Sequence, residues 1–269
     1  MKIIYNKKSL LKVIKNQKNL GFVPTMGCIH KGHLSLVENS KKKSNKTLVS
    51  IYINKPQFNK INDFNKYPRT LRKDIFYLKK AKVDFLYLPR EKDIYPSKKI
   101  KKIRITPFSK QLCGKFRPNH FVAVVNVLDR FIRIIKPEKI YMGEKDMQQL
   151  KIVEHYINKT FENVKLIPCK TIREKNGVAM SSRNKLLSIN EMNISSKVYK
   201  YIYYNKKKII NNLINIKNLK SLILKFGIKK IDYIKILNIN GFIKSNTKKT
   251  KYKIFIAYYL GSTRLIDNI

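Results

Sequence analysis

The sequence has no long hydrophobic run. Its longest apolar stretches, such as Phe121–Val125 and Ile254–Leu260, are far shorter than the ~18 residues that a membrane-spanning helix needs. Lysines interrupt every apolar stretch of the first twenty residues, so a signal peptide is not expected. Hydrophobic residues still make up 43% of the 269 positions, which argues against a disordered chain. We therefore expect a folded cytoplasmic protein with no membrane partner.

Cysteine is scarce as well. Cys28, Cys113 and Cys169 are odd in number, far apart and not arranged as CxxC. A disulfide framework or a thiolate zinc site is therefore not expected, and buried reduced thiols are the simplest interpretation.

Acidic residues are also scarce. The chain has 16 aspartates and glutamates but 60 lysines and arginines, which gives a net charge of +44. So basic a chain suggests a nucleic-acid or acidic-membrane partner. The lysines are nevertheless spread along the whole sequence, and no RNA- or DNA-binding motif accompanies them. We expect no specific nucleic-acid partner and interpret the charge as a compositional bias. Nucleic-acid binding stays an alternative that rests on the charge alone.

Short apolar runs alternate with helical patterns in the first two thirds of the chain. Such alternation predicts βαβ units, and hence an α/β fold with a Rossmann-like parallel sheet covered by helices on both faces. The expected strands are Leu20–Thr25, Thr47–Ile53, Val83–Leu88, Lys139–Met142 and Val164–Pro168. The expected helices are Lys31–Lys43, Leu71–Ala81, His120–Ile135 and Asp146–Asn158. Ligands of such sheets bind beyond the carboxyl ends of the strands.

The pattern changes at about Lys170. A Lys/Asn-rich helical stretch is followed by strand-like runs at Tyr233–Ile239 and Tyr252–Leu260. We therefore expect two domains, a Rossmann-like domain over residues 1–169 and a smaller α+β domain over residues 170–269.

Half of the chain's four histidines lie within one stretch, PTMGCIHKGH at positions 24–33. If a strand ends at Thr25 and a helix begins near His30, then His30 and His33 share one face of its first turn. The N–H groups and dipole of a helix start attract anions, which favours a phosphate site. The simpler alternative is that His30 caps the helix and His33 packs. A zinc site is less favoured, because an HEXXH arrangement and a third ligand are absent.

Two further stretches carry charge at predicted turns. In GEKDMQQL (143–150), Asp146 is a good helix N-cap, Lys145 can reach a phosphate or a carboxylate, and Gln149 follows one turn later. In REKNGVAMSSRN (173–184), small hydroxyls beside Arg183 fit a loop that wraps phosphates, although for this stretch taken alone a solvated turn is the default interpretation.

Together the motifs are more specific than any one of them. The order PTMGxxHxGH, NxxQF, YPRT, RPxHF, GEKDxQQ, MSSRN and LGSTRLIDN resembles the pantothenate synthetase (pantoate–β-alanine ligase) family over nearly the whole chain. That family is related to class I aminoacyl-tRNA synthetases through its HxGH and KMSKS-like signatures. The resemblance implies the predicted two-domain fold, with the smaller domain closing the site, and a homodimer.

The resemblance also implies a reaction and its residues. Pantoate would attack the α-phosphorus of ATP to give pantoyl adenylate and pyrophosphate, and β-alanine would then displace AMP. By position, the residues of the ATP side are Met26, His30, His33, Gly143, Lys145, Asp146, Met180, Ser181, Ser182 and Arg183. Of these, the histidines, Lys145 and the Ser-Ser-Arg run would be catalytic. Gln57 and Gln149 would bind pantoate, and Asn54 would line the β-alanine end. Mg²⁺ is expected on the phosphates, without a named protein ligand.

The chain departs from the family pattern at two loops. Lys55 stands between Asn54 and Pro56, where the family usually has Pro directly after the Asn, so the loop that holds Gln57 is expected to bend differently. Asn119 replaces a usual glycine, and Asn tolerates a positive φ better than other non-glycine residues. Another nucleotidyltransferase, acting on a different acceptor, is the alternative within enzymes.

Overall fold

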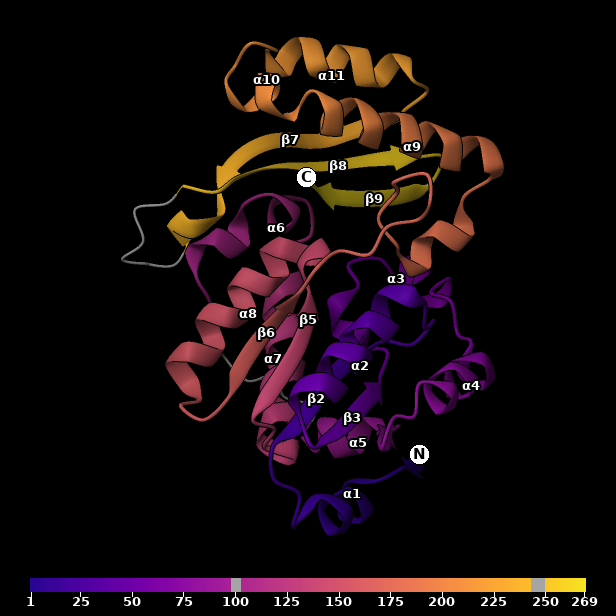
Figure 1. Ribbon diagram of the computed structural model, residues 1–269, viewed down its shortest axis with the longest axis vertical. Coiled ribbons are helices and arrows are strands. Elements are labelled where there is room, and N and C mark those ends of the chain that lie inside the picture. Colours follow the sequence, from indigo (N-terminus) through magenta and orange to yellow (C-terminus); the bar gives the residue numbers. More distant parts are fainter. Residues whose placement is uncertain (98–102, 243–249) are drawn as a thin grey trace. The chain divides into compact units, whose positions relative to one another are not determined.

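Residues 1–97, 103–242 and 250–269 are described in a computed structural model of the chain (Figure 1). They divide into two units. The first comprises Met1–Glu144 and Gln148–Lys170, and the second comprises Lys145–Met147 and Thr171–Ile269. The short segment Lys145–Met147 thus packs with the second unit, although the residues on either side of it belong to the first.

The first unit is built on a six-stranded parallel sheet in the order β1-β4-β3-β2-β5-β6. Its strands are β1 (Lys2–Ile4), β2 (Leu20–Thr25), β3 (Lys46–Ile51), β4 (Phe85–Tyr87), β5 (Lys139–Gly143) and β6 (Lys165–Cys169). The central strand β2 is buried along almost its whole length. Strands covered on both faces are apolar at successive positions, and this explains the run LGFVPT.

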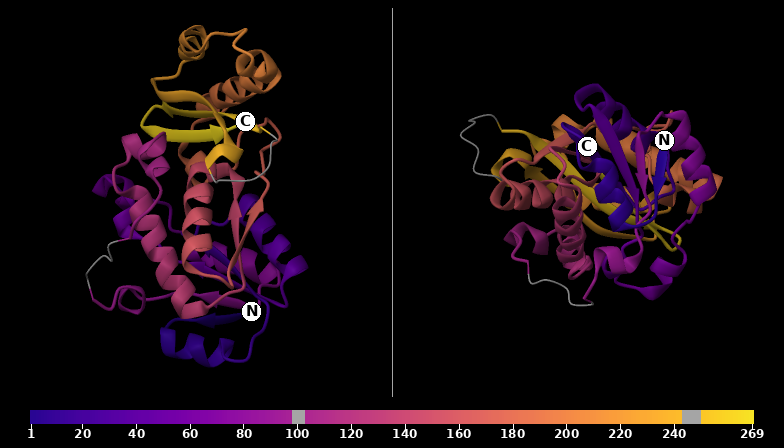
Figure 2. Two further views of the ribbon diagram at one scale, coloured as in Figure 1. Left: turned by 90° about the vertical axis from the view of Figure 1, so that its left-hand side faces the viewer. Right: turned by 90° about the horizontal axis from the view of Figure 1, so that it is seen from below.

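Helices connect these strands and cover both faces of the sheet (Figure 2). They are α1 (Lys7–Ile14), α2 (Lys31–Lys43), α3 (Ile61–Asn65), α4 (Leu71–Lys80), α5 (Glu91–Ile94), α6 (Cys113–Phe116), α7 (His120–Ile135) and α8 (Met147–Thr160). From β2 through β3 to β4 the chain moves toward the β1 edge of the sheet, whereas from β4 through β5 to β6 it moves toward the β6 edge. Because the crossovers are right-handed, α2 and α4 lie on one face of the sheet and α7 and α8 lie on the other.

The second unit contains a three-stranded antiparallel sheet in the order β7-β8-β9. Its elements are α9 (Ile189–Tyr204), α10 (Lys206–Ile210), α11 (Ile216–Lys225), β7 (Lys230–Asn238), β8 (Tyr252–Leu260) and β9 (Thr263–Asn268). The three helices lie along one face of the sheet (Figure 1), and isoleucines such as Ile202, Ile223 and Ile254 fill the space between. A capping box between Ser188 and Glu191 starts α9.

The predicted fold class is confirmed. The helices Lys31–Lys43 and His120–Ile135 and the strands Leu20–Thr25 and Tyr252–Leu260 have the predicted bounds. The elements β1, α1 and β9 were not predicted from the sequence, and β4 is shorter than the predicted Val83–Leu88. No helix in the described parts of the chain is both long and apolar enough to cross a membrane.

Candidate active site

The candidate site of the first unit lies where the strand order reverses. From β2 the chain crosses to β3 on one side, whereas from β5 it crosses to β6 on the other. Strands β2 and β5 are neighbours in the sheet, so their carboxyl ends border the crevice in which open parallel sheets bind ligands. Met26 and the histidine stretch follow β2, and Gly143 ends β5. The predicted ATP-side residues of this unit therefore come to one edge of the sheet.

The turn after β2 is held by Asp74 of α4. The carboxylate accepts hydrogen bonds from the Cys28 N–H at 2.9 Å, the Ile29 N–H at 2.8 Å and the Thr70 hydroxyl at 3.0 Å. Asp74 is only 2% exposed. Cys28 has a positive φ of 54°, which few non-glycine residues adopt. The carboxylate therefore stabilises an uncommon backbone conformation just before His30.

His30 is the N-cap of α2, and its Nδ1 accepts a hydrogen bond from the Gly32 N–H at 3.1 Å. A neutral imidazole that accepts at Nδ1 carries its hydrogen on Nε2, which can then donate to an anion. The His33 ring stacks on the His30 ring with centroids 4.0 Å apart. Capping and anion binding are therefore compatible, because capping selects the tautomer that presents Nε2–H.

The loop after β3 holds Asn54 and Gln57 in a fixed hydrogen-bond network. The Asn54 amide group donates to the Ala123 carbonyl at 3.2 Å and to Gln57 Oε1 at 2.8 Å, and its Oδ1 accepts from the Tyr95 hydroxyl at 2.8 Å. The Ala123 carbonyl can only accept, so the Asn54 atom facing it must be nitrogen. The Gln57 atom facing that same nitrogen must then be oxygen. Gln57 is consequently oriented with its NH₂ group away from Asn54.

The backbone of this loop is tied to the start of α7. The Gln57 carbonyl lies 2.8 Å from His120 Nδ1 and accepts from Arg117 at 3.1 Å. Asn119, just before this helix, has a φ of 62°, so the predicted tolerance of a positive φ is used. Lys55 and Pro56 form, with Gln57, a short 3₁₀ turn.

The charged turn after β5 contributes to both units. Glu144–Asp146 form a 3₁₀ turn directly before α8, and the Lys145 ammonium lies 3.4 Å from the Asp146 carboxylate. Gln148 is buried, and its amide bonds to the backbone of Cys113, Phe108 and Gln111. Gln149 is half-buried in the first turn of α8.

The predicted phosphate loop begins with a tight hairpin in the second unit. Arg173 pairs with Ala179 across it, and Gly177 at the turn has a φ of 91° beside the Tyr199 ring. Met180 is buried at its end. There follows a 3₁₀ turn, η4 (Ser182–Leu186), which Ser181 caps by accepting from the Arg183 N–H at 3.2 Å. A hydroxyl that accepts in this way can still donate its own hydrogen.

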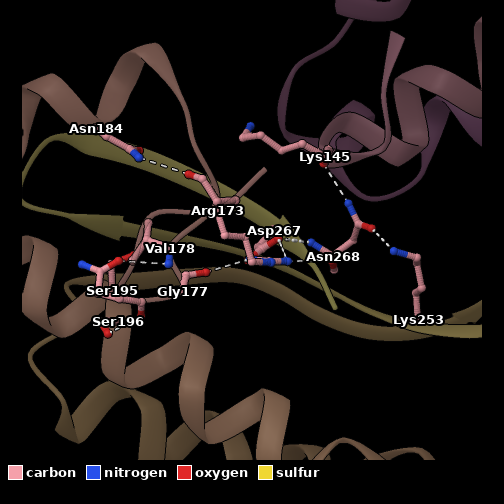
Figure 3. Close-up of polar contacts among 12 residues, drawn as sticks. Lys145, Arg173, Gly177, Val178, Asn184, Ser195, Ser196, Lys253, Asp267 and Asn268 are labelled. Carbon is pink, nitrogen blue, oxygen red and sulfur yellow. Dashed lines mark hydrogen bonds and ion pairs between the residues drawn. The ribbon is translucent and has the colours of Figure 1, made fainter. Parts of the chain in front are cut away.

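The hairpin and the Lys145 turn are both bound by the end of β9 (Figure 3). The Arg173 guanidinium makes two hydrogen bonds to the Asp267 carboxylate, at 2.6 and 3.0 Å. The next residue, Asn268, donates its side-chain amide to the Lys145 carbonyl at 2.8 Å. The predicted ATP-side residues of the second unit thus belong to two segments with a common anchor.

Several residues of this framework were not predicted from the sequence. Asp74 carried a signal that could have been recognised, since it shares the buried face of α4 with Leu78, four residues on. Tyr95 carried none, because its partner is distant in sequence, whereas Asn268 ends the LGSTRLIDN motif, which gave no indication of its partners. The structure describes no group of three or more His, Cys, Asp or Glu residues that could hold a metal ion in residues 1–97, 103–242 and 250–269.

Comparison with known proteins identifies proteins that are similar over almost the whole chain. The model of the family described as pantoate-beta-alanine ligase matches residues 2–269. The pantothenate synthetase of Caldicellulosiruptor saccharolyticus is 37% identical over 271 residues, which are 99% of this chain and 96% of that protein. The pantothenate synthetase of Francisella tularensis subsp. mediasiatica is 39% identical over 259 residues, 95% of this chain and 90% of that protein.

Two solved structures are similar over the entire chain. The pantoate-beta-alanine ligase of Francisella tularensis, complexed with beta-gamma ATP and beta-alanine, has a TM-score of 0.87 at 35% identity and is covered over 97% of its length. The pantothenate synthetase of Thermus thermophilus has a TM-score of 0.91 at 27% identity and is covered over 99%.

Proposed function

The chain belongs to the pantoate–β-alanine ligase family, and from this membership we infer that it condenses pantoate with β-alanine to pantothenate at the expense of ATP. The observation that carries the inference is the family match over residues 2–269. The histidine stretch beside the switch point of the parallel sheet supports it, since helix starts at this position bind anions.

The reaction we propose has two steps. A carboxylate oxygen of pantoate attacks the α-phosphorus of ATP, and the bond from that phosphorus to the bridging oxygen breaks, so pyrophosphate leaves with the electron pair. The amine of β-alanine then attacks the acyl carbon of pantoyl adenylate, loses a proton and expels AMP. Because negative charge builds on the phosphoryl oxygens, the protein's main task is to position the reactants and supply fixed positive groups.

His30 would donate from Nε2 to a phosphate oxygen, in the tautomer set by its bond to the Gly32 N–H. His33, stacked on it, would contact the same phosphates. Lys145 would offset the charge of the α-phosphate and of the attacking carboxylate, and Asp146 would bind the ribose. The remaining contacts of the ATP side are proposed for Met26, Gly143, Met180, Ser181, Ser182 and Arg183.

Gln57 would bind pantoate through its NH₂ group, because its oxygen already accepts from Asn54. A donor at this position suits the carboxylate or hydroxyl oxygens of pantoate. Gln149 would complete the pantoate site. Asn54 is 1% exposed and both of its amide hydrogens are used within the protein, so we propose that it orients Gln57 rather than contacting β-alanine.

Mg²⁺ would enter with ATP, held by phosphate oxygens and water, as this ion commonly is at nucleotide sites. We also propose a homodimer, and a division of labour in which residues 1–169 bind ATP and pantoate and residues 170–269 close the site. The cytoplasm is the proposed compartment, because three cysteines that are far apart in the sequence and not arranged as CxxC favour reduced thiols.

The direct test is pantoate-dependent exchange of pyrophosphate into ATP by the purified protein, with Mg²⁺ and without β-alanine. His30→Ala and Lys145→Ala should each lower the exchange rate by at least about 100-fold, because each removes a group that binds developing charge. His155→Ala and Lys159→Ala, both in α8, are matched controls and should exchange like the wild type. Exchange by the wild type that did not need pantoate would instead indicate a nucleotidyltransferase with another acceptor.

A further inference from the structure

The LGSTRLIDN motif at the end of the chain has no role in the reaction described so far. Its last residues, Asp267 and Asn268, end β9, which pairs with β8 along its whole length. Asn268 is 2% exposed, although it lies one residue from the end of the sequence. A buried amide must be hydrogen-bonded, so its partners indicate what it does.

Two partners of the Asn268 side chain determine its orientation. Its Nδ2 donates to the Lys145 carbonyl at 2.8 Å, and its Oδ1 accepts from the Lys253 ammonium at 2.7 Å (Figure 3). A carbonyl can only accept and an ammonium can only donate, so the reverse orientation would lose both bonds. Asn268 therefore joins the antiparallel sheet to the backbone of Lys145 in one defined geometry.

This bond fixes the point from which the Lys145 side chain departs. The 3₁₀ turn Glu144–Asp146 is only three residues long, and 3₁₀ turns have weaker internal hydrogen bonds than α-helices. The strand end that binds the turn is itself held to β8 by reciprocal backbone bonds of 3.0 Å between Ile254 and Ile269. Figure 3 shows the Lys145 side chain leaving the turn on the side away from Asn268. Asn268 thus holds the backbone and leaves the ammonium to act elsewhere.

We propose that Asn268 is a positioning residue for the adenylation step, acting through the backbone of Lys145. The proposal rests on the function proposed above, in which Lys145 offsets charge during the attack on ATP. Asp267 acts in parallel, because its two bonds from Arg173 anchor the hairpin that leads to Met180 and Ser181. The end of β9 is therefore a common support for both ATP-side segments of the second unit.

The test uses Asn268→Asp, which has the same shape but cannot donate to the Lys145 carbonyl. Its carboxylate can still accept from Lys253, so the buried charge is compensated. Lys253→Met is the matched control, because it removes the other partner and leaves the bond to Lys145. Pantoate-dependent ATP–pyrophosphate exchange measures the first step, and release of pantothenate from supplied pantoyl adenylate and β-alanine measures the second.

We expect Asn268→Asp to slow exchange by roughly 10- to 100-fold, the scale at which a misplaced group impairs catalysis, and to change the second step by less than about threefold. Lys253→Met should exchange within about threefold of the wild type, because the bond to Lys145 is kept. Equal exchange by the two variants, or equal slowing of both steps in Asn268→Asp, would overturn the proposal. Asn268→Ala provides a second variant, and failure of both Asn268 variants to fold would assign the residue to the fold instead. If the wild type itself did not exchange, the proposed function would fail first.

Discussion

Replacing Asp74 by alanine should strongly destabilise the first unit. The carboxylate is the acceptor for the Cys28 and Ile29 N–H groups, and alanine would leave both of these buried donors without it. An unsatisfied buried donor costs about 1–3 kcal/mol, so the two together should cost about 2–6 kcal/mol of unfolding free energy. This is a large part of the roughly 5–15 kcal/mol that stabilises a typical protein.

Asp74→Asn separates the contributions of the two oxygens. If the amide oxygen takes the place of Oδ1, it keeps the hydrogen bonds from Ile29 and Thr70. The amide NH₂ group then faces the Cys28 N–H, and because both groups are donors, that hydrogen bond is lost. We therefore expect a smaller loss of about 1–3 kcal/mol. The turn that precedes His30 should also loosen, so both variants should exchange pyrophosphate more slowly than the wild type.

Urea unfolding followed by far-ultraviolet circular dichroism is the suitable assay, because the chain has no tryptophan for fluorescence. Glu162→Ala is the matched control, since this exposed carboxylate should change stability by no more than about 0.5 kcal/mol. The chain has two units, so the transition midpoint of each is compared rather than one two-state free energy. Our reasoning about the turn would be refuted if Asp74→Ala and Glu162→Ala unfolded at the same urea concentrations.

Three further predictions follow from the buried polar groups. Asn54→Asp cannot donate to the Ala123 carbonyl or to Gln57, so the side-chain amide of Gln57 should reverse its orientation. The KM for pantoate, measured by saturation of pyrophosphate exchange, should then rise about 10- to 100-fold. An unchanged KM would contradict the orientation of Gln57 described above. Burial raises the pKa of Tyr95 from 10.0 to about 12, so the unfolded chain loses this proton at a lower pH than the folded chain. The free energy of unfolding should therefore fall as pH rises from 10 to 12. Tyr95→Phe should reduce this fall by on the order of 2 kcal/mol, as urea midpoints will show. Burial likewise raises the pKa of the Cys169 thiol to about 11, so iodoacetamide at about pH 8 should alkylate it only after unfolding, as intact mass will show.

The histidine stretch illustrates how two interpretations of one motif can both apply. Capping by His30 and phosphate binding are alternatives only if one nitrogen must serve both. In the structure Nδ1 caps α2, which leaves Nε2 as the donor. The structural role of His30 therefore prepares the chemical role that we propose for it.

Features that depend on neighbouring residues could be predicted from the sequence. The apolar run of β2, the helical period of α7 and the start of α2 near His30 are set by short stretches, and their bounds agree with the structure. The same holds for the positive φ at Asn119, which depends on the conformational range of one residue type. β9 was missed because its pattern becomes strand-like only beside β8.

The tertiary structure alone decided which polar groups meet. Asp74 lies 46 positions from Cys28, Asn54 lies 69 from Ala123, and Asn268 lies 123 from Lys145. Each of these bonds joins segments that only the tertiary fold brings together, and no local pattern encodes a partner so far along the chain. The sequence by itself, in contrast, determined the family, the α/β class and the residues that carry the proposed chemistry. Only the fold determined how those residues are held, because hydrogen bonds in a buried site depend on the path of the whole chain.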